Sequence, residues 1–308
     1  MTGRFAPTPT SELHLGNVRT ALIAWLMARR EGGRFLLRIE DLDTQRMAGS
    51  SQIAARQEAD LAWLGLTWDG EVMLQSRRAN AYAAALESLQ GRAYECFCTR
   101  RDIAEAAVAP HGDGYRPYPG TCRELSAAQR AERRGSRPAA LRIKAAGVVQ
   151  TVNDLWAGDV TAVVDDFVLV RNDGTPAYNL AVVVDDLAQG VDQVVRGDDL
   201  LSSAPRQAWL TRQLGGEVPR YAHVPLAVNP SGRRLAKREG DVTLAQLRDR
   251  GWAPEQVVAL LAHSLELARG RDRVRPADLL EEFAPTQVPR SPWVVDPDVV
   301  LGTGPRQA

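Results

Sequence analysis

Residues 4–39, RFAPTPTSELHLGNVRTALIAWLMARREGGRFLLRI, contain three elements of secondary structure in an informative order. A short strand at 4–7 runs into a turn rich in Pro, Thr and Ser. From Gly16 apolar residues recur at helical spacing until a glycine pair at 32–33, and residues 35–39 then form a buried strand. This order predicts a βαβ unit within a parallel sheet, with a ligand site at the carboxyl ends of the strands.

The rest of the chain continues the α/β pattern. Three further stretches have helical periodicity, the last one broken near Gly251: 51–64, 79–89 and 244–265. Strands are expected at 167–170 and 178–184, and a polar, basic loop is expected at 229–240. We expect the tail from Asp296 to be poorly ordered.

Composition limits the possible classes of protein. The 308 residues are 44% hydrophobic, and 38 Lys and Arg balance 38 Asp and Glu. A net charge of zero argues against binding of nucleic acid or membranes through a globally cationic surface, but it allows a local basic groove. The start has no apolar stretch of signal-peptide length, and no window approaches the ~20 apolar residues of a membrane span. We therefore expect a cytoplasmic protein.

Two short motifs point to phosphate chemistry when they are considered together. His14-Leu15-Gly16-Asn17 lies between the first strand and its helix, where free backbone N–H groups favour a phosphate. Residues 234–238, RLAKR, form a basic loop that could fold over a triphosphate. Taken singly, the first motif is better explained as a histidine that caps a buried helix, and the second as a solvated loop.

In combination, these motifs resemble the paired HIGH and KMSKS motifs of class I aminoacyl-tRNA synthetases. Further segments are similar to the catalytic core of glutamyl-tRNA synthetases: RFAPTPTSELHLGNVRTAL, LLRIEDLDTQR, WLGLTWDG, GTPAYNLAVVVDD and VVRGDDLLSSAPRQ. The similarity runs over about residues 3–265. The sequence has HLGN for HIGH, and RLAKR where the glutamyl branch favours KLSKR, so Ala236 lacks a hydroxyl group. The resemblance implies a Rossmann-type parallel-sheet catalytic domain.

The resemblance also implies a pocket for L-glutamate. It would be formed by Arg4, Ala6, Thr8, Glu40, Tyr178 and Arg196. The two arginines would bind the two carboxylates, because a planar guanidinium meets a carboxylate through two parallel hydrogen bonds. The acidic residue would bind the ammonium group, the tyrosine would supply a hydroxyl group, and the two small residues would line the floor. Taken singly, Arg4 could lie on the surface, Glu40 could begin a helix, and Tyr178 could belong to the core.

The implied reaction is attack of a glutamate carboxylate on the α-phosphate of ATP, which gives glutamyl-adenylate and pyrophosphate. ATP, with Mg²⁺, would be bound by His14, Gly16, Asn17, Arg234 and Lys237. His14 and Lys237 would be the catalytic residues, acting through positioning and charge stabilisation rather than as nucleophiles. A hydroxyl group of a nucleic acid would then attack the mixed anhydride.

All three cysteines lie close together in the sequence. Cys96, Cys98 and Cys122 offer three thiolates to a soft tetrahedral metal, which favours zinc. His111 is the generic choice of fourth ligand, but a related branch of the family places a tyrosine four residues before the last cysteine, and Tyr118 matches that position. The resemblance therefore favours Tyr118, with one structural zinc ion per chain. The alternative is three free, buried thiols.

The resemblance divides the chain into four parts. These are the first half of the catalytic domain at 1–94, an inserted zinc-bearing α+β acceptor domain at 95–177, the second half with the KMSKS-like loop at 178–240, and a short helical extension at 241–308. Too few residues follow that loop for an anticodon-binding domain. The chain thus resembles a truncated branch of the family that attaches glutamate to queuosine, the modified wobble base of tRNA(Asp). A monomer is expected.

Two other functions remain open at this point: a truncated enzyme that charges tRNA(Glu), and a non-catalytic, synthetase-like regulatory protein. An enzyme that accepts an anticodon loop needs a groove with positive charge and stacking surfaces. Seven arginines gather in and after the insertion: Arg100, Arg101, Arg116, Arg123, Arg130, Arg133 and Arg134. They fit such a groove and a solvated, arginine-rich surface equally well.

Overall fold

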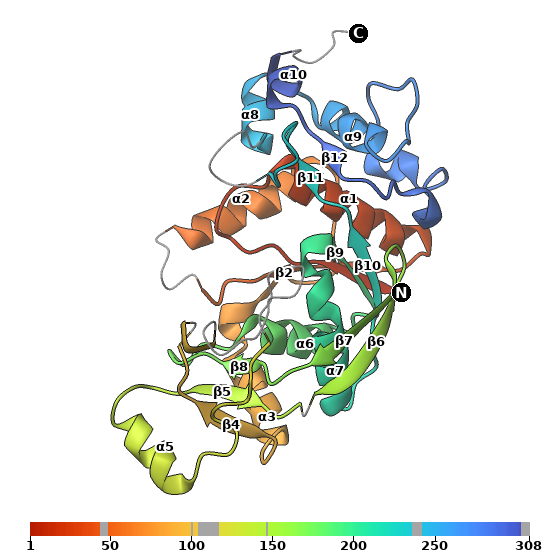
Figure 1. Cartoon of the computed structure of the whole chain (residues 1–308). Coiled ribbons are helices and arrows are strands. Elements are labelled where there is room, and N and C mark those ends of the chain that lie inside the picture. Colours follow the sequence, from red (N-terminus) through yellow and green to blue (C-terminus); the bar gives the residue numbers. More distant parts are fainter. Residues whose placement is uncertain (44–48, 100, 104–116, 146, 236–241, 303–308) are drawn as a thin grey trace.

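A seven-stranded sheet runs through the middle of the chain in the computed structural model (Figure 1). The structure describes residues 1–43, 49–99, 101–103, 117–145, 147–235 and 242–302. In spatial order the strands are β3 (Met73–Leu74), β2 (Arg34–Ile39), β1 (Thr2–Phe5), β9 (Gln193–Gly197), β10 (Arg220–Val224), β6 (Val148–Asp154) and β7 (Gly158–Val164). Neighbouring strands are parallel except β6 and β7, which form an antiparallel hairpin. The prediction of a mostly parallel sheet is confirmed.

The expected βαβ unit is part of this sheet, with α1 (Leu15–Arg30) between the neighbouring strands β1 and β2. His14 is the N-cap of the helix, and its Nδ1 atom accepts hydrogen bonds from the N–H groups of Gly16 and Asn17. Gly32, just past the end of the helix, has a positive φ of 63°, which glycine adopts without steric cost. The chain can therefore turn directly from the helix into β2.

Strands β1, β2, β9 and β10 are buried on both faces of the sheet, since successive residues of a strand point to opposite sides. In β2, Phe35 and Leu37 belong to the large core that contains α1, whereas Leu36 belongs to a separate core. Helix α1 packs on β1, β2 and β9, and α7 (Ala204–Gln213) packs on β6 and β7. These four strands are thus almost continuously buried, as is typical of parallel sheets covered on both faces, whereas in β6 and β7 exposed residues alternate with more buried ones.

The predicted helices are confirmed, whereas the strand predicted at 178–184 is wrong. The confirmed helices are α2 (Ser50–Trp63), α3 (Ala79–Ser88) and the interrupted pair α8 (Leu244–Asp249) and α9 (Pro254–His263). Residues 178–184 instead begin α6 (Tyr178–Gln189). This helix packs against α3, α7 and β8 (Val168–Val170), so Leu180 to Val184 are all buried. An unbroken buried run has no helical periodicity, and its valines resemble a strand.

The tail is ordered further than predicted. Residues Pro297–Gly302 form α10, and Asp296 Oδ1 caps it by accepting hydrogen bonds from the N–H groups of Asp298 and Val299. Just before it, β12 (Trp293–Val294) pairs in parallel with β11 (Ala227–Val228). The expectation of disorder from Asp296 is therefore wrong up to residue 302, and residues 303–308 lie outside the described residues.

A smaller antiparallel sheet lies at the opposite end of the view from the C-terminus (Figure 1). It consists of β4 (Ala93–Cys96), β5 (Ala140–Ile143) and β8, with α5 (Ala127–Arg134) beside it. The stretch 95–177 contributes β5 and β8 to this sheet but contributes the β6–β7 hairpin to the main sheet. The main sheet therefore extends into the stretch predicted as an insertion, and the four domain boundaries stay a prediction.

Short 3-10 helices complete the described elements: η2 (Gln75–Arg77), η3 (Asp198–Ser203), η4 (Pro276–Leu279) and η5 (Pro285–Gln287). Among the described residues, no helix has the length and apolar character needed to cross a bilayer.

Leu22 tests the packing of α1 because its side chain is fully buried in the large core that contains this helix. Leu22→Ala should lower the free energy of unfolding by about 2–5 kcal/mol, since it removes apolar contacts and leaves a cavity. Arg30→Ala, at the exposed end of the same helix, should change it by less than about 0.5 kcal/mol. Urea denaturation measures both, and equal losses would contradict this packing.

Candidate active site

A cavity of about 740 Å³ opens at the carboxyl ends of β1, β2 and β9. Ligands are expected at this edge of a parallel sheet. The cavity is lined by all the described residues that the sequence predicted for glutamate and ATP: Arg4, Ala6, Thr8, His14, Gly16, Asn17, Glu40, Tyr178, Arg196 and Arg234. Lys237 lies outside the described residues. The structure thus brings the predicted residues together, and their individual roles stay predictions.

A buried network of charges supports this cavity. Asp186 on α6 accepts hydrogen bonds at Oδ1 from Arg4 Nε at 3.2 Å and from Arg38 Nη1 at 2.8 Å. Arg38 is fully buried and also donates to Gln189 Oε1 at 2.8 Å and to Glu40 Oε1 at 3.3 Å. Burial opposes ionisation of Asp186, but Arg38 and Arg4 outweigh it and hold the pKa of this carboxyl below its ordinary value. The network therefore contains an ionised Asp186 shared by two arginines.

Glu40 follows β2 and lies at the edge of this network. Burial raises the pKa of the Glu40 carboxyl, although Arg38 and Arg4 oppose that effect. An ammonium group beside Glu40 would favour the carboxylate form. Its position and electrostatics thus fit the predicted site for the ammonium group of glutamate.

Arg196 differs from Arg4 in the charge of its partners. In the described part of the chain Arg196 forms no ion pair, and its guanidinium donates only to neutral acceptors: His223 Nε2 at 2.9 Å, Gln207 Oε1 at 2.6 Å, Tyr178 Oη at 3.3 Å and the Leu200 carbonyl at 3.3 Å. Arg4, in contrast, shares the Asp186 carboxylate. The charge of Arg196 is therefore the less compensated of the two, and a substrate carboxylate would interact with it most strongly.

His14 performs the capping role that was the alternative to phosphate binding, and it also lines the cavity. The cap uses Nδ1, at 3.1 Å from the Gly16 nitrogen. A Cβ on Gly16 would lie only 3.1 Å from both Ala227 and the His14 ring, so glycine keeps this approach open. The N-terminus of α1, with its partial positive charge, consequently meets the cavity.

The described residues on either side of Lys237 lie beside this same turn. Before it in the sequence, the Leu235 N–H donates to the Ala227 carbonyl at 3.2 Å, and Leu235 lines the cavity. After it, the Val242 carbonyl accepts from the Leu15 N–H at 3.0 Å. Leu235 and Val242 are thus hydrogen-bonded to the strand and helix that border the cavity.

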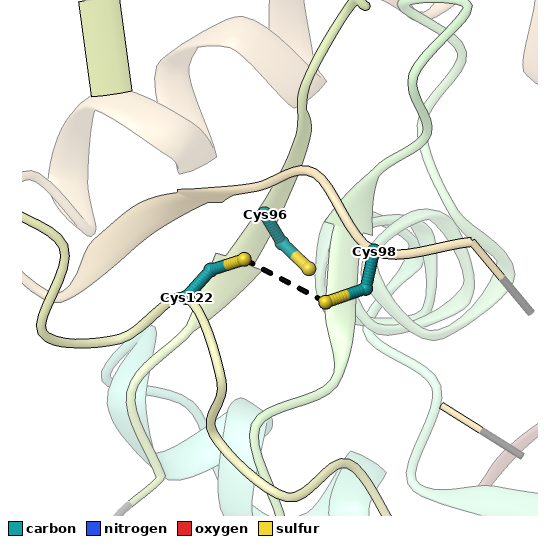
Figure 2. A group of neighbouring side chains, drawn as sticks. All are labelled: Cys96, Cys98 and Cys122. Atoms are coloured by element: carbon teal, nitrogen blue, oxygen red, sulfur yellow. Dashed lines mark hydrogen bonds between the residues drawn. The ribbon is translucent and has the colours of Figure 1, made fainter. Parts of the chain in front are cut away.

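The three cysteines meet at one point close to the end of β4, whose last residue is Cys96 (Figure 2). Their sulfur atoms all lie within 4.8 Å of one another, with Cys98 and Cys122 3.6 Å apart. Tyr118 joins them: its Oη lies 3.3 Å from Cys96 Sγ and accepts the Cys122 N–H at 2.8 Å. His111 lies outside the described residues. Three soft sulfur donors and one phenol oxygen fit the tetrahedral coordination of zinc.

Burial disfavours the ionised forms of two groups in this cluster, Cys98 and Tyr118. Burial raises the pKa of the Cys98 thiol to about 12, and it also raises the pKa of the Tyr118 hydroxyl. Burial acts in the same direction on Cys122, but hydrogen bonds, first that from the Phe97 N–H, lower the pKa of this thiol. A divalent metal would stabilise the thiolate forms that burial disfavours.

The arginines predicted to line an RNA groove are engaged within the molecule where the structure describes their contacts. Arg123 donates to Asp166, Arg134 forms two hydrogen bonds with Glu95, Arg130 donates to the Leu125 carbonyl, and Arg133 donates to Cys122 Sγ. Arg100 and Arg116 lie outside the described residues. The groove stays a prediction.

Several residues that organise the cavity were not found from the sequence: Arg38, Asp154, Asp186, Gln207 and His223. Two of them carry a local signal. Arg38 interrupts the apolar strand LLRI, and Asp186 follows the apolar run LAVVVD. A charged residue inside a buried run needs a partner of opposite charge, and pairing these two would have been the simplest solution.

Known proteins are similar to this chain in fold and in sequence. Residues 1–300 match the family described as tRNA synthetases class I (E and Q), catalytic domain. A glutamyl-Q tRNA(Asp) synthetase of Nocardia farcinica is 56% identical over 97% of this chain and 94% of its own length. A glutamate–tRNA ligase of Pelobacter propionicus is 38% identical over 97% of this chain, which spans 64% of that ligase.

A solved structure agrees with this result. The glutamate-tRNA synthetase of Elizabethkingia anophelis has a TM-score of 0.79 and 28% identity, covering 96% of this chain and 68% of that one. The chain therefore belongs to the class I tRNA synthetases for glutamate and glutamine. The resemblance inferred from the motifs is confirmed.

Asp186→Asn tests the charge network because it keeps the shape of the side chain but removes the charge shared by Arg4 and Arg38. Unpaired buried charges are costly, so we expect the free energy of unfolding to fall by about 3–5 kcal/mol. The pKa of Asp186 is held below its ordinary value. The difference from wild type should thus be complete above about pH 3.9 and shrink as the pH falls further.

Urea denaturation at several pH values measures this difference. Asp249→Asn, at an exposed position, is the matched control and should change stability by less than about 0.5 kcal/mol. An Asp186→Asn effect as small as that of the control would contradict the network.

Proposed function

We propose that this chain is a ligase-type enzyme that activates L-glutamate with ATP and transfers it to the queuosine base in the anticodon of tRNA(Asp). The observation that carries the proposal is the pattern of identity. Six relatives named glutamyl-Q tRNA(Asp) synthetase are 41–56% identical and are covered over 78–96% of their own length, whereas two glutamate–tRNA ligases are 38–40% identical and are covered over 64%. We propose that the enzyme is cytoplasmic and monomeric.

Glutamate would bind at the carboxyl ends of β1, β2 and β9. Arg196 would bind one carboxylate and Arg4 the other, while Glu40 would bind the ammonium group. The weakly compensated charge of Arg196 and the burial of Glu40 support these roles. Tyr178, which accepts a hydrogen bond from Arg196, would direct its hydroxyl group to the substrate, and Ala6 and Thr8 would form the floor.

ATP would lie with its phosphates at the N-terminus of α1. His14, Gly16, Asn17 and Arg234 line the cavity there, and Lys237 and Mg²⁺ would complete the phosphate site. A glutamate carboxylate oxygen attacks the α-phosphorus, the bond to the β-phosphate oxygen breaks, and pyrophosphate leaves. The residues stabilise the charge that develops on the phosphates, so no side-chain nucleophile is required.

The second step uses the acceptor's own hydroxyl group. Queuosine has a cis-diol on its cyclopentene ring, which resembles the 2′,3′-diol of a terminal ribose. One of its hydroxyl oxygens attacks the carbonyl carbon of glutamyl-adenylate and loses its proton, an ester bond forms, and AMP leaves with the electron pair of the broken bond. The same adenylate site is therefore suited to an acceptor in an anticodon loop, which the inserted segment at 95–177 would contact.

One structural zinc ion per chain would be held by Cys96, Cys98, Tyr118 and Cys122. The 4.8 Å grouping of the sulfurs and the nearby phenol oxygen support this set. Zinc would stabilise the small sheet region, where α5 has no buried residues.

The acceptor specificity is tested with labelled glutamate, ATP and three RNAs. We expect labelling of tRNA(Asp) that contains queuosine, and no labelling of tRNA(Asp) without queuosine or of tRNA(Glu). We also expect glutamate-dependent ATP–pyrophosphate exchange without any tRNA. Comparable labelling of tRNA(Glu), or equal labelling of tRNA(Asp) with and without queuosine, would contradict the proposal. Absence of both exchange and transfer would indicate a non-catalytic protein.

The zinc site is tested by metal analysis of gently purified protein. We expect one zinc ion per chain, and clear loss of zinc in Cys122→Ser and Tyr118→Phe, because each variant lacks one ligand atom. Tyr94→Phe is the matched control: Tyr94 lies in the same small core but donates its hydroxyl hydrogen to Asp166. It should retain its zinc, whereas a ratio well below one in wild type would disprove the site.

A further inference from the structure

Behind Arg196 lies a chain of hydrogen bonds that the proposed reaction does not use. Asp154 ends β6, and His223 in β10 is the direct neighbour of Arg196 in β9. The side chains of Asp154 and His223 are both completely buried. Asp154 Oδ2 lies 2.6 Å from His223 Nδ1, and Arg196 Nε donates to His223 Nε2 at 2.9 Å. The three side chains therefore form a continuous line that ends at the cavity.

The surroundings of Asp154 determine where the imidazole proton lies. Asp154 Oδ1 accepts the N–H groups of Trp156 and Ala157, and Oδ2 accepts the backbone N–H of His223. Burial opposes its ionisation, but these donors and His223 lower the pKa of Asp154, so it is a carboxylate that can only accept. Nδ1 of His223 must then carry the hydrogen, which leaves Nε2 as the acceptor for Arg196.

The imidazole is neutral in this arrangement. Burial lowers the pKa of His223, and Arg196 and Arg4 act in the same direction, against the opposing effect of Asp154. Arg196 is thus held by a neutral group, as it also is by Gln207. A carboxylate at the position of His223 would fix the guanidinium equally well, but it would also neutralise the charge that a substrate carboxylate needs.

We propose that His223, oriented by Asp154, is a positioning residue for glutamate: it fixes the guanidinium of Arg196 through Nε and leaves its charge available to a substrate carboxylate. This inference rests on the proposed function, because it takes glutamate as the ligand of Arg196. It assigns the specificity of the pocket to a residue that does not itself line the cavity.

Two amide variants separate the roles of the two imidazole nitrogens. Asn in place of His223 reaches Asp154 but not Arg196, whereas the longer Gln can place its amide oxygen where Arg196 Nε donates. We expect His223→Asn to weaken glutamate binding by about tenfold or more, the effect of losing a hydrogen bond to a charged group. His223→Gln should recover most of that loss. The KM for ATP should change by less than about twofold in both, because the acceptor of Arg196 does not contact the phosphate site.

Glutamate binding is measured by calorimetry, the KM for ATP by pyrophosphate exchange, and folding by the melting temperature. His263→Asn is the matched control: its imidazole lies against backbone carbonyls of Ala268 and Arg271 and should have no influence on glutamate binding. A His223→Asn variant that binds glutamate as wild type does would overturn the inference. Parallel losses for glutamate and ATP in both variants, without recovery in Gln, would assign His223 a structural role only and would also overturn it.

A measurement on the unmodified protein does not depend on how the variants fold. The imidazole ¹⁵N resonances of His223 should show a single neutral tautomer with the hydrogen on Nδ1, and a hydrogen on Nε2 would overturn the inference. If wild type neither binds glutamate nor exchanges pyrophosphate, the proposed function fails and this inference fails with it. If wild type does both, any failure seen in the variants belongs to the inference alone.

Discussion

The carboxylate of Asp186 connects the parts of the chain on which the cavity depends. It belongs to α6 and accepts hydrogen bonds from Arg4 of β1 and Arg38 of β2 at the same oxygen atom. Arg38, fixed in this way, contacts Glu40 at the end of β2. Two parallel strands and one helix are thus held in register by buried charges, and the side chains at the cavity inherit their positions from that arrangement.

The two arginines of the cavity, Arg4 and Arg196, differ in the charge of the groups that hold them. Arg4 is held by an ion pair, and its charge is shared within the protein. Arg196 is held by a ring nitrogen, an amide oxygen, a phenol oxygen and a carbonyl oxygen, none of which is charged in the described state. A dicarboxylate that enters the cavity would therefore meet one arginine that is rigid but partly neutralised and one that is rigid and still cationic. The two carboxylates of such a ligand would therefore meet electric fields of different strength.

The sequence supported the central βαβ unit, the parallel sheet and the meeting of distant residues at one cavity, because these follow from periodicity and from motifs in a known order. The prediction of a strand at 178–184 was wrong because the first part of α6 is buried on several sides, so it has no polar face that would indicate a helix. The sequence also could not place the β6–β7 hairpin in the main sheet, since strand pairing across the chain has no local signature. Asp154 and His223 were missed for the same reason, as their relationship depends on two strands being neighbours.

The pairing of β12 with β11 has a consequence for the order in which the molecule is completed during synthesis. The backbone N–H groups of Trp293 and Val295 donate hydrogen bonds to the carbonyls of Leu226 and Val228, in and next to β11. β11 leaves the ribosome well before β12, so in the nascent chain it has no partner on that side. The β11–β12 pair can therefore form only after every strand of the main sheet has been synthesised.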